Sequence, residues 1–339
     1  MTLLHIAEKC DGASGVATFV RELDVSLRGL GVDSRACSHV EKAGHIDVLH
    51  IHGLWLPFFH RAAKWAKSKG VPVVWSTHGM TAPWSMHHKR WKKLMAWWLY
   101  QRRDLREAAA IHCTTELELR WNKKLGFDNC FIAPLGTREN KCHSPNYTIN
   151  HTLLFVGRIY PVKGLVNLIK AWKIAISGQQ LGVGGERWKL RIVGPDEAGH
   201  LAFLRSLVSQ LSLDSSVEFP GPKFGAELSD EYEACDCLVL PSFTENFGAT
   251  IVDAMAHGKP CIASTFTPWR ELQDRGCGWW TSNEPTKLAA AILEMMSLGD
   301  ATRREMGARG CKLVEEKYTW DAIARIMIHE YQKVISSCP

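Results

Sequence analysis

Signals of several common protein classes are missing from this sequence of 339 residues. No stretch reaches the roughly 18 consecutive apolar residues of a transmembrane helix, so no membrane span is expected. The first ten residues lack the basic region and apolar core of a signal peptide, so we expect a cytoplasmic protein. No Cys-x-x-Cys pair occurs among the 11 cysteines, which argues against a disulfide framework or a zinc site and favours reduced thiols. The G-x-G-x-x-G fingerprint and the P-loop motif are absent too.

The net charge is small but unevenly distributed. The 41 Lys and Arg exceed the 35 Asp and Glu by six, which is too little to indicate nucleic-acid binding. Residues 1–150 hold 21 cations and 13 anions, a net of +8, and the remainder holds 20 and 22, a net of −2. The segment Trp84–Arg106 alone has seven cations against Asp104. Tryptophan gathers in the same region, with five of the 14 copies between Trp75 and Trp98.

Short apolar runs alternate with amphipathic stretches in the first half of the chain, which predicts an α/β fold with parallel strands. The predicted strands are Leu3–Ala7, Val48–His52, Val71–Thr77, Ile111–Thr114 and Cys130–Ala133. The predicted helices are Val16–Gly29, Pro57–Ser68, Trp84–Ala109 and Glu116–Lys124. The polar segment Pro134–Asn150 carries Pro and Gly without periodicity and is interpreted as a linker.

The same alternation restarts in the second half. The predicted strands are Leu153–Val156, Leu190–Val193, Val217–Phe219, Cys237–Leu240, Cys261–Ala263 and Gly278–Thr281. The predicted helices are Leu165–Ile176, Leu201–Leu211, Glu227–Cys235, Ala249–His257, Pro285–Ser297, Thr302–Lys317 and Trp320–Val334. Two consecutive doubly wound halves predict a cleft between two domains, with ligands beyond the carboxyl ends of the strands.

The first candidate site is the loop Asp11–Val16, between a predicted strand and a predicted helix. Its glycines, Gly12 and Gly15, would let backbone amides approach an anion, and a helix N-terminus favours negative charge. The loop is equally consistent with a tight turn that binds nothing.

The second candidate site follows the predicted strand Leu153–Val156. The loop Val156–Gly164 places two permanent cations, Arg158 and Lys163, in a short stretch. Two cations at the carboxyl end of a strand suit a diphosphate, whose charge grows as it departs as a leaving group. The alternative is a pair of solvated loop cations.

The third and most informative candidate is the segment Leu240–Pro260. A strand is predicted to end at its beginning, and a helix to start near Phe247. The exposed amides at that start, near Phe247–Thr250, form an anion site. Glu245 then lies in the loop before the helix, and Asp253 lies about two turns inside it, as an acceptor for hydroxyl groups. The alternative makes Glu245 a capping residue and Asp253 a surface acid.

The fourth candidate is a group of histidines at the ends of two buried strands. His50 and His52 share one face of their strand because side chains alternate with a period of two. His78 follows the next strand, in Thr77-His78-Gly79. A histidine at a strand end is more often structural than catalytic, so His78 becomes a functional candidate if the cleft places it opposite Glu245.

These motifs together resemble the retaining glycosyltransferases of family 4, which have the GT-B fold of two Rossmann-like, doubly wound parallel-sheet domains facing across a cleft. Val-Gly-Arg-x-x-x-x-Lys-Gly is filled by Val156–Gly164. Pro-Ser-x-x-Glu-x-Phe-Gly through Ala-x-Ala-x-Gly-x-Pro is filled by Pro241–Pro260. The resemblance covers nearly the whole chain. We expect an acceptor-binding domain over 1–145, with the last helix, about 320–339, packing back on it, and a donor-binding domain over 146–319.

The resemblance implies a nucleotide-sugar donor, UDP- or GDP-linked, held mainly by the second domain. Arg158 and Lys163 match the cations that hold the donor diphosphate, and Gly15 matches the loop that touches it. His78 matches a first-domain histidine at the sugar and acceptor side, and Glu245 matches the acid that faces the donor sugar. The other donor-binding positions are backbone amides and a second acid that binds the ribose: Asn246, Phe247, Gly248, Ala249, Thr250 and Asp253.

The family uses no metal, because basic side chains and a helix terminus replace it, so no cofactor is expected. The implied reaction is retaining transfer by a hexosyltransferase-type enzyme of class EC 2.4. Arg158, Lys163 and the helix start stabilise the departing nucleoside diphosphate, the acceptor hydroxyl attacks from the same face, and Glu245 orients the donor sugar.

The sequence departs from the family pattern in two places. The second acid, usually Glu, is Asp253, which leaves the preference for base and sugar open. The N-terminal loop reads Gly12-Ala13-Ser14-Gly15 instead of a Gly-Gly pair.

The basic segment Trp84–Arg106 points to the acceptor. Trp91, Leu94, Met95 and Trp98 recur at helical spacing among its cations, which is typical of helices that bind anionic membrane surfaces. Many similar enzymes extend glycans on polyprenyl diphosphate lipids. The resemblance therefore implies a lipid-linked glycan acceptor in bacterial exopolysaccharide, capsule or lipopolysaccharide synthesis, and a peripheral place on the inner face of the membrane. The alternative is a helix that packs its Trp face on the first domain and leaves its cations in solvent.

Two other functional classes stay open at this point. A sugar-nucleotide epimerase, a phosphorylase or another enzyme of GT-B fold would share the general pattern, although no lysine site for pyridoxal phosphate is identifiable. A basic nucleic-acid binder would leave Glu245 and Asp253 unexplained, so no nucleic-acid partner is expected.

Overall fold

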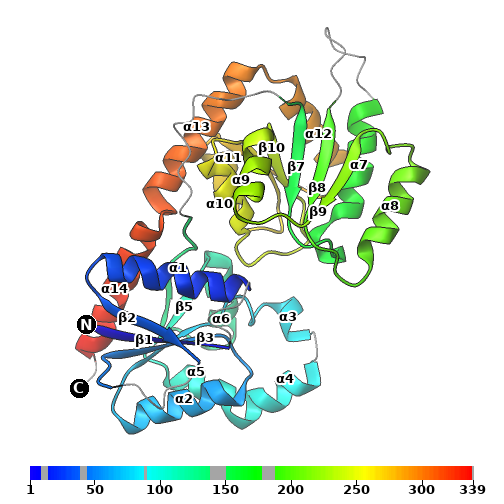
Figure 1. The fold of residues 1–339 in the computed structure, drawn as a ribbon. Helices are drawn as coiled ribbons and strands as arrows, with labels where there is room; N and C mark the ends of the chain where they lie inside the picture. The colour runs from blue at the N-terminus through cyan, green and yellow to red at the C-terminus, as the bar shows by residue number, and fades with distance from the viewer. Residues whose placement is uncertain (9–13, 39–43, 88–89, 138–149, 178–187, 338–339) are drawn as a thin grey trace. The chain divides into compact units, whose positions relative to one another are not determined.

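The computed structural model describes residues 1–8, 14–38, 44–87, 90–137, 150–177 and 188–337. The chain folds into two compact units, which Figure 1 shows as ribbons. The first unit comprises Met1–Gly136 and Tyr318–Pro339, and the second comprises Thr137–Lys317. The expected boundaries were at residues 145 and 319. Residues 138–149, which contain most of the predicted linker, lie outside the described residues.

The first unit is built on a parallel six-stranded sheet with the order β2-β1-β3-β4-β5-β6. Its strands are β1 Thr2–Ala7, β2 Asp33–Cys37, β3 Val48–His52, β4 Val73–Ser76, β5 Ala110–Cys113 and β6 Cys130–Ile132. The five predicted strands are confirmed. β2 was not predicted because this edge strand reads Asp-Ser-Arg-Ala-Cys, and a strand with exposed alternate positions shows no apolar run.

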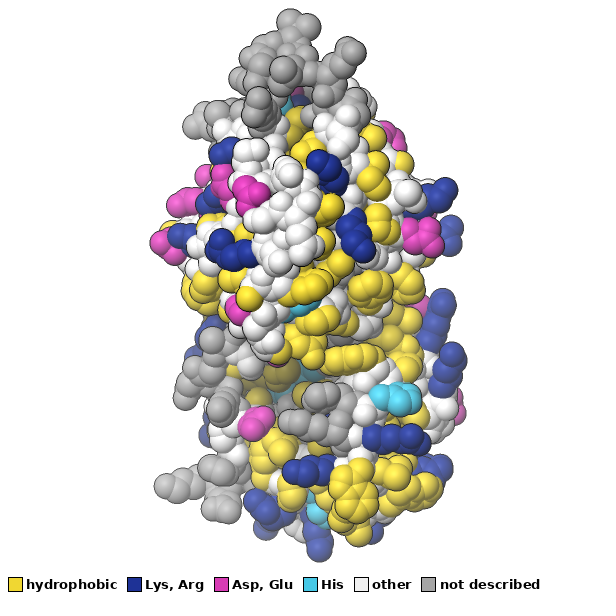
Figure 2. All heavy atoms as spheres, turned by 90° about the vertical axis from the view of Figure 1, so that its right-hand side faces the viewer, with side chains coloured by type: hydrophobic (Ala, Val, Ile, Leu, Met, Phe, Trp, Pro, Cys, Tyr) yellow, Lys and Arg dark blue, Asp and Glu magenta, His cyan; other side chains and the backbone are white. Residues whose placement is uncertain are grey.

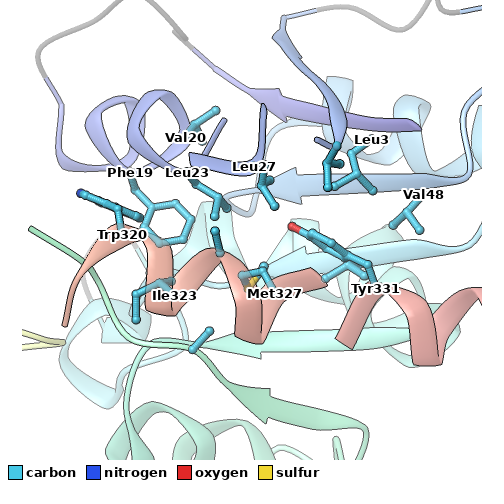
Figure 3. Close-up of a cluster of buried hydrophobic side chains, with 14 of the residues drawn as sticks. Leu3, Phe19, Val20, Leu23, Leu27, Val48, Trp320, Ile323, Met327 and Tyr331 are labelled. Atoms are coloured by element: carbon cyan, nitrogen blue, oxygen red, sulfur yellow. The ribbon is translucent and has the colours of Figure 1, made fainter. Parts of the chain in front are cut away.

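Helices cover both faces of this sheet. The buried core on one face includes side chains of α1 (Gly15–Gly29) and α14 (Trp320–Ser337), and the core on the other includes side chains of α2 (Pro57–Ser68) and α5 (Arg102–Glu107). A further helix, α6 (Glu116–Lys124), follows β5. Figure 3 shows the α1–α14 core, where α1 and α14 contribute Phe19, Val20, Leu23, Leu27, Trp320, Ile323, Met327 and Tyr331. The last helix of the chain therefore completes the core of the first unit.

The predicted helix Trp84–Ala109 is confirmed over residues 90–107, which are helical without a break: α4 Arg90–Ala96, the π-helical turn η1 Trp97–Gln101, and α5. The short helix α3 Pro83–His87 precedes them, and residues 88–89 lie outside the described residues. Trp55 holds the π-helical turn, because its amide donates to Gln101 Oε1 at 2.8 Å and its carbonyl accepts from the Tyr100 hydroxyl at 2.5 Å. Trp97 and Gln101 are both buried. They are four residues apart and therefore share one face of the helix.

A chain of hydrogen bonds crosses the sheet and ends on α14. A carbonyl only accepts, so His112 donates through Nε2 to the Ala133 carbonyl at 2.7 Å, and its Nδ1 accepts from Ser76 Oγ at 2.6 Å. Ser76 has one hydroxyl hydrogen, so His50 donates through Nε2 to Ser76 at 2.7 Å. His50 Nδ1 then accepts from the Tyr331 hydroxyl at 2.6 Å. Burial lowers the pKa of both histidines and keeps them neutral, as this direction requires.

The second unit contains another parallel six-stranded sheet, with the order β12-β11-β10-β7-β8-β9. Its strands are β7 Thr152–Val156, β8 Lys189–Val193, β9 Val217–Gly221, β10 Cys237–Leu240, β11 Cys261–Ser264 and β12 Gly278–Thr281. Its helices are η2 (a 3₁₀ turn) Pro161–Lys163, α7 Leu165–Ser177, α8 His200–Gln210, α9 Gly225–Ala234, α10 Ala249–Ala256, α11 Glu271–Asp274, α12 Pro285–Ser297 and α13 Asp300–Lys317. The predicted α/β class and the six strands are confirmed. The short α11 was not predicted, because four residues are too few to show a helical period.

Within the described residues, no helix is both long enough and apolar enough to span a membrane. Seven cysteines of the described part are free thiols: Cys37, Cys113, Cys130, Cys235, Cys237, Cys261 and Cys277.

Replacing Tyr331 by Phe removes the hydroxyl that donates to His50 Nδ1 and leaves this buried nitrogen without a partner. We expect the free energy of unfolding to fall by about 1–3 kcal/mol, measured by urea denaturation. Tyr100→Phe is the matched control, because its hydroxyl also donates one hydrogen bond but lies at a partly exposed position. It should lose less than Tyr331→Phe, and equal losses would contradict the role of the buried chain.

Candidate functional site

The candidate site of the second unit lies where β7 and β10 end, since these two strands are neighbours in the sheet. Lys163 Nζ and Glu245 Oε1 are 2.5 Å apart, and the Ser242 hydroxyl donates to the same carboxylate oxygen at 2.8 Å. The two charged side chains are only 15% and 12% exposed. Among the described residues, Glu245 Oε2 makes no hydrogen bond, so the carboxylate is oriented through one oxygen and can offer the other to a ligand. Ser242 was not among the predicted site residues.

Gly164 allows the two strand-end loops to approach one another. Its φ is 71°, and a Cβ there would lie 2.1 Å from the Pro241 carbonyl oxygen. The loops are also joined by the Phe243 amide, which donates to the Val162 carbonyl at 2.8 Å. Because only glycine fits this left-handed, crowded position, the Lys-Gly pair of the motif places Lys163 next to the β10 loop.

Helix α10 (Ala249–Ala256) begins just beyond Glu245 in the chain. Gly248 has a φ of 85°, and a Cβ there would come within 2.8 Å of Leu240 and 3.1 Å of the Trp269 indole nitrogen. That nitrogen donates to the Phe247 carbonyl at 2.5 Å. The helix therefore starts after Gly248, because the left-handed residue interrupts the helical backbone. The predicted helix Ala249–His257 is confirmed, and the approximate start near Phe247 is two residues too early. The first amides of α10 have no acceptor within the helix, which is the property that the anion site requires.

Asp253 lies about one turn into α10, so its predicted position about two turns inside the helix is wrong. Its Oδ1 accepts from the Thr137 hydroxyl at 3.1 Å, so the carboxylate does bind a hydroxyl group in this structure. In the turn before it, Thr250 Oγ1 is buried and has no hydrogen-bond partner among the described residues. A polar atom of this kind is a position at which a ligand can complete the hydrogen bonding.

Arg158 does not join the Lys163–Glu245 pair. Its Nη1 lies 2.6 Å from Glu197 Oε2, a residue of the segment after β8, and its side chain is 58% exposed. The two cations of the motif thus have different partners in this structure. Lys163 is held in a mostly buried ion pair, whereas Arg158 is on the surface and free to change partner at little cost.

His78 belongs to the first unit, in the turn after β4. Its φ of 47° is uncommon for a residue other than glycine, and its side chain is partly exposed. Burial lowers the pKa of His78 to about 4, although the negative charge of Glu118 opposes this shift. The imidazole is therefore neutral near pH 7 and can donate or accept one hydrogen bond at each nitrogen according to its tautomer.

Glu118 was not among the predicted site residues. Its Oε1 accepts from the Thr77 hydroxyl at 2.6 Å and the Gly79 amide at 2.5 Å, and its Oε2 accepts from the amide and hydroxyl of Thr114 at 2.7 and 2.8 Å. The sequence contains one signal for Glu118, because Thr115–Glu118 matches the capping-box motif of a helix N-terminus. That motif predicts a carboxylate turned back on its own helix, whereas this one bridges the ends of β4 and β5.

Gly15 is the first residue of α1. Ser14 caps this helix, because its hydroxyl accepts from the Ala17 amide at 3.2 Å. The amides of Gly15 and Val16, in the first turn, have no acceptor within the helix, as an anion contact near Gly15 would need. Residues 9–13, with the rest of the predicted loop, lie outside the described residues.

An exposed apolar stripe runs along α4 and η1. It consists of Trp91, Leu94, Met95, Trp98 and Leu99, of which Trp91 is 71% and Trp98 67% exposed. Figure 2 shows hydrophobic side chains next to Lys and Arg side chains on the face that carries α3 and α4. The alternative in which the Trp face packs on the first domain is wrong for these residues. The buried side of the segment is instead formed by Ala96, Trp97, Gln101, Asp104 and Leu105.

Solved structures define the class of this fold. Sucrose-phosphate synthase from Thermosynechococcus elongatus matches with a TM-score of 0.74 and 18% identity over 99% of both chains. Anabaena HepE in complex with UDP and glucose matches with a TM-score of 0.76 and 16% identity over 98% of this chain and 100% of HepE. The two parallel six-stranded sheets thus form the GT-B fold of glycosyltransferases.

Family models assign the chain within this class. Residues 150–297 match "Glycosyl transferases group 1", and residues 15–135 match "Glycosyl transferase 4-like domain". The chain therefore belongs to the group 1 glycosyltransferases, and the resemblance expected from its motifs is confirmed.

The most similar curated proteins include a D-inositol 3-phosphate glycosyltransferase of Kineococcus radiotolerans, which is 31% identical over 198 residues, covering 54% of this chain and 44% of the relative. They also include an uncharacterized glycosyltransferase of Methanocaldococcus jannaschii, 27% identical over 220 residues, covering 64% and 50%. The matches span about half the length of these relatives.

Gly164→Ala tests the contact that brings the two loops together. We expect it to lower the midpoint of thermal unfolding more than Gly199→Ala does. Both glycines have φ near 70°, but a Cβ on Gly199 meets nothing within 4 Å. Gly199→Ala should therefore lower the free energy of unfolding by about 1–2 kcal/mol, because alanine disfavours the left-handed backbone conformation. Gly164→Ala carries the same penalty and adds the clash with the Pro241 carbonyl. Equal losses would contradict the crowding at Gly164.

Proposed function

We propose that this chain is a retaining glycosyltransferase that moves a sugar from a UDP- or GDP-linked donor to a hydroxyl group of a glycan acceptor. The Lys163–Glu245 pair beside the start of α10 carries this proposal. It combines a cation, a carboxylate with one oxygen free for a ligand, and helix amides at two neighbouring strand ends. Cations and helix amides suit a diphosphate, and a carboxylate suits a sugar hydroxyl. Anabaena HepE, which shares the fold, holds UDP and glucose in its solved structure, which supports a donor of this class.

The proposed reaction breaks the bond between the anomeric carbon and the donor diphosphate. The acceptor hydroxyl oxygen forms the new bond on the same face of the sugar, and its proton goes to the departing phosphate. Lys163 and the α10 amides stabilise the charge that grows on this phosphate, and Arg158 joins them by leaving Glu197. Glu245, held through one oxygen by Lys163 and Ser242, orients the sugar with the other.

No metal is part of this proposal. A diphosphate leaving group needs positive charge, which enzymes supply with a metal ion or with cationic side chains and helix amides. Lys163, Arg158 and the start of α10 offer the second solution. Asp253, which already accepts a hydrogen bond from a hydroxyl group, is proposed to bind the ribose. Gly15 and His78 are proposed to contact the diphosphate and the sugar from the first unit.

The proposed acceptor is a lipid-linked glycan of a bacterial surface polysaccharide pathway, met at an anionic membrane surface. Two observations support binding to a membrane surface. The stripe of Trp91, Leu94, Met95, Trp98 and Leu99 exposes large apolar side chains, and the segment Trp84–Arg106 carries seven cations against one anion. Apolar side chains with flanking cations match the interface and headgroups of an anionic bilayer.

Glu245→Ala tests the donor site. We expect transfer of a labelled sugar to fall to roughly 1% of wild type or less, because the carboxylate orients the donor in the transition state. The donor is first chosen from a panel of UDP- and GDP-sugars as the one that raises the unfolding temperature. Glu227→Ala, at an exposed acid of the same unit, should keep full activity. A folded Glu245→Ala protein with near-wild-type turnover would refute the assignment.

Vesicle co-sedimentation tests the membrane surface. The wild type should bind vesicles of phosphatidylcholine with phosphatidylglycerol more tightly than phosphatidylcholine alone, and less tightly as salt rises. The double variant Trp91→Ser/Trp98→Ser should weaken binding roughly ten-fold or more, since two large apolar side chains no longer enter the interface. Phe203→Ser/Phe224→Ser, at exposed positions of the second unit, should not. Absence of binding to anionic vesicles at low salt would contradict the proposal.

A further inference from the structure

A second chain of hydrogen-bonded imidazoles lies beside the one that ends on Tyr331. His5 Nδ1 and His52 Nε2 are 2.9 Å apart, and His52 Nδ1 and His78 Nε2 are 3.1 Å apart. His5 and His52 are fully buried in β1 and β3, and His78 is the partly exposed end of the chain. The contacts thus lead from the interior of the sheet to a residue at its carboxyl edge.

All three rings are neutral near pH 7. Burial lowers the pKa of His5 to about 3 and of His78 to about 4, and it lowers the pKa of His52 well below its usual value. The neighbouring His50, whose ring centroid lies 3.9 Å from that of His52, adds repulsion against a charge on His52. Each ring therefore carries one N–H and one lone pair.

Only two proton arrangements satisfy both contacts. Both nitrogens of His52 are bonded to an imidazole, so His52 donates on one side and accepts on the other. If it donates to His78, then His5 donates to it, His78 holds its proton on Nδ1, and His5 Nε2 is a bare lone pair. If it accepts from His78, the outer nitrogen of His78 is a lone pair and His5 Nε2 carries a hydrogen.

The unpaired nitrogen of His5, at the buried end of this hydrogen-bond chain, indicates which of the two proton arrangements is present. His5 Nε2 is buried and has no partner within the described part of the chain. Among backbone groups, buried N–H donors without an acceptor are rarer than buried acceptors without a full set of donors, and we infer the same preference for this ring nitrogen. The favoured arrangement therefore places the lone pair on His5 Nε2 and the proton on His78 Nδ1.

We propose that His5 and His52 are positioning residues that hold His78 as its Nδ1–H tautomer, so that His78 meets its ligand as a hydrogen-bond donor and not as a base. The group that it recognises is an acceptor oxygen, such as a sugar hydroxyl or a phosphate oxygen. Glu118 supports this by fixing the two residues on either side of His78, through the Thr77 hydroxyl and the Gly79 amide. The ligand part of this proposal rests on the proposed function, whereas the tautomer does not.

A metal ion is the competing use of the same residues, since ring nitrogens of His5, His50 and His52 lie within 4.8 Å of one another. The contacts argue against it. The 2.9 Å between His5 and His52 is shorter than the roughly 3.3 Å between two ligands of tetrahedral zinc. Both nitrogens of His50 are already bonded, to Tyr331 and Ser76.

Nitrogen-15 NMR of the full chain with labelled histidine tests the proposal without any substrate. Two-bond correlations distinguish the tautomers, and the His78 signal is assigned by its loss in His78→Asn. We expect Nδ1–H for His78 in the wild type. In His52→Phe, which removes its partner, His78 should shift towards the Nε2–H form that histidine prefers in water. His52→Gln, whose amide can donate to His78, should restore Nδ1–H, and Tyr331→Phe, which breaks the other chain, should leave it unchanged.

An Nε2–H tautomer in the wild type would overturn the proposal, and so would a His78 signal that is unchanged in His52→Phe. Metal-bound shifts at His5 and His52 after addition of one equivalent of Zn²⁺ would overturn it too. With an active donor and acceptor, His52→Phe should lower kcat/KM roughly 2- to 10-fold, the value of one hydrogen bond, and His52→Gln should recover it. The tautomer is measured in the unliganded protein. Failure of the tautomer proposal and failure of the glycosyltransferase assignment therefore give different results.

Discussion

The close approach of two loops at the ends of β7 and β10 is the contact on which the candidate donor site depends. A left-handed Gly164 lies against the Pro241 carbonyl, and the Phe243 amide donates across the same gap to Val162. Lys163 is thereby placed within hydrogen-bond distance of Glu245. With a side chain at Gly164 the loops would separate, and the cation and carboxylate would no longer share one position beside α10. The glycine of the motif is thus a steric requirement of the ion pair next to it.

The first unit buries several polar side chains within its parallel sheet. His5, His50, His52, Ser76 and His112 lie under α1 and α14, where an unpaired polar atom costs free energy. One chain of hydrogen bonds is complete, because it ends on a carbonyl at one side and on Tyr331 of the last helix at the other. The other chain leaves one buried nitrogen without a partner and ends on His78. The first chain stabilises the core. In the second chain, the unpaired His5 Nε2 is the atom from which we infer which nitrogen of His78 carries the proton.

Most strands were predictable because a buried parallel strand is a short apolar run between turns. The edge strand β2 was not, since its exposed positions are polar. The π-helical turn at Trp97–Gln101 also escaped prediction, because it depends on contacts with a distant residue. Trp55 holds this turn through its backbone amide and carbonyl.

The sequence by itself determined the α/β class, the two halves, the family and most of the candidate site, because apolar periodicity and the Lys163–Gly164 and Glu245 motifs are local patterns. Only the tertiary structure decided which charges pair. Arg158 and Lys163 are equivalent cations in the sequence, yet one pairs with Glu197 on the surface and the other with Glu245 in a mostly buried position. It also decided that Trp91 and Trp98 are exposed while Trp97 is buried, and that Glu118 bridges two strand ends. Pairing and burial depend on distances between residues far apart in the chain, and no spacing along the sequence contains them.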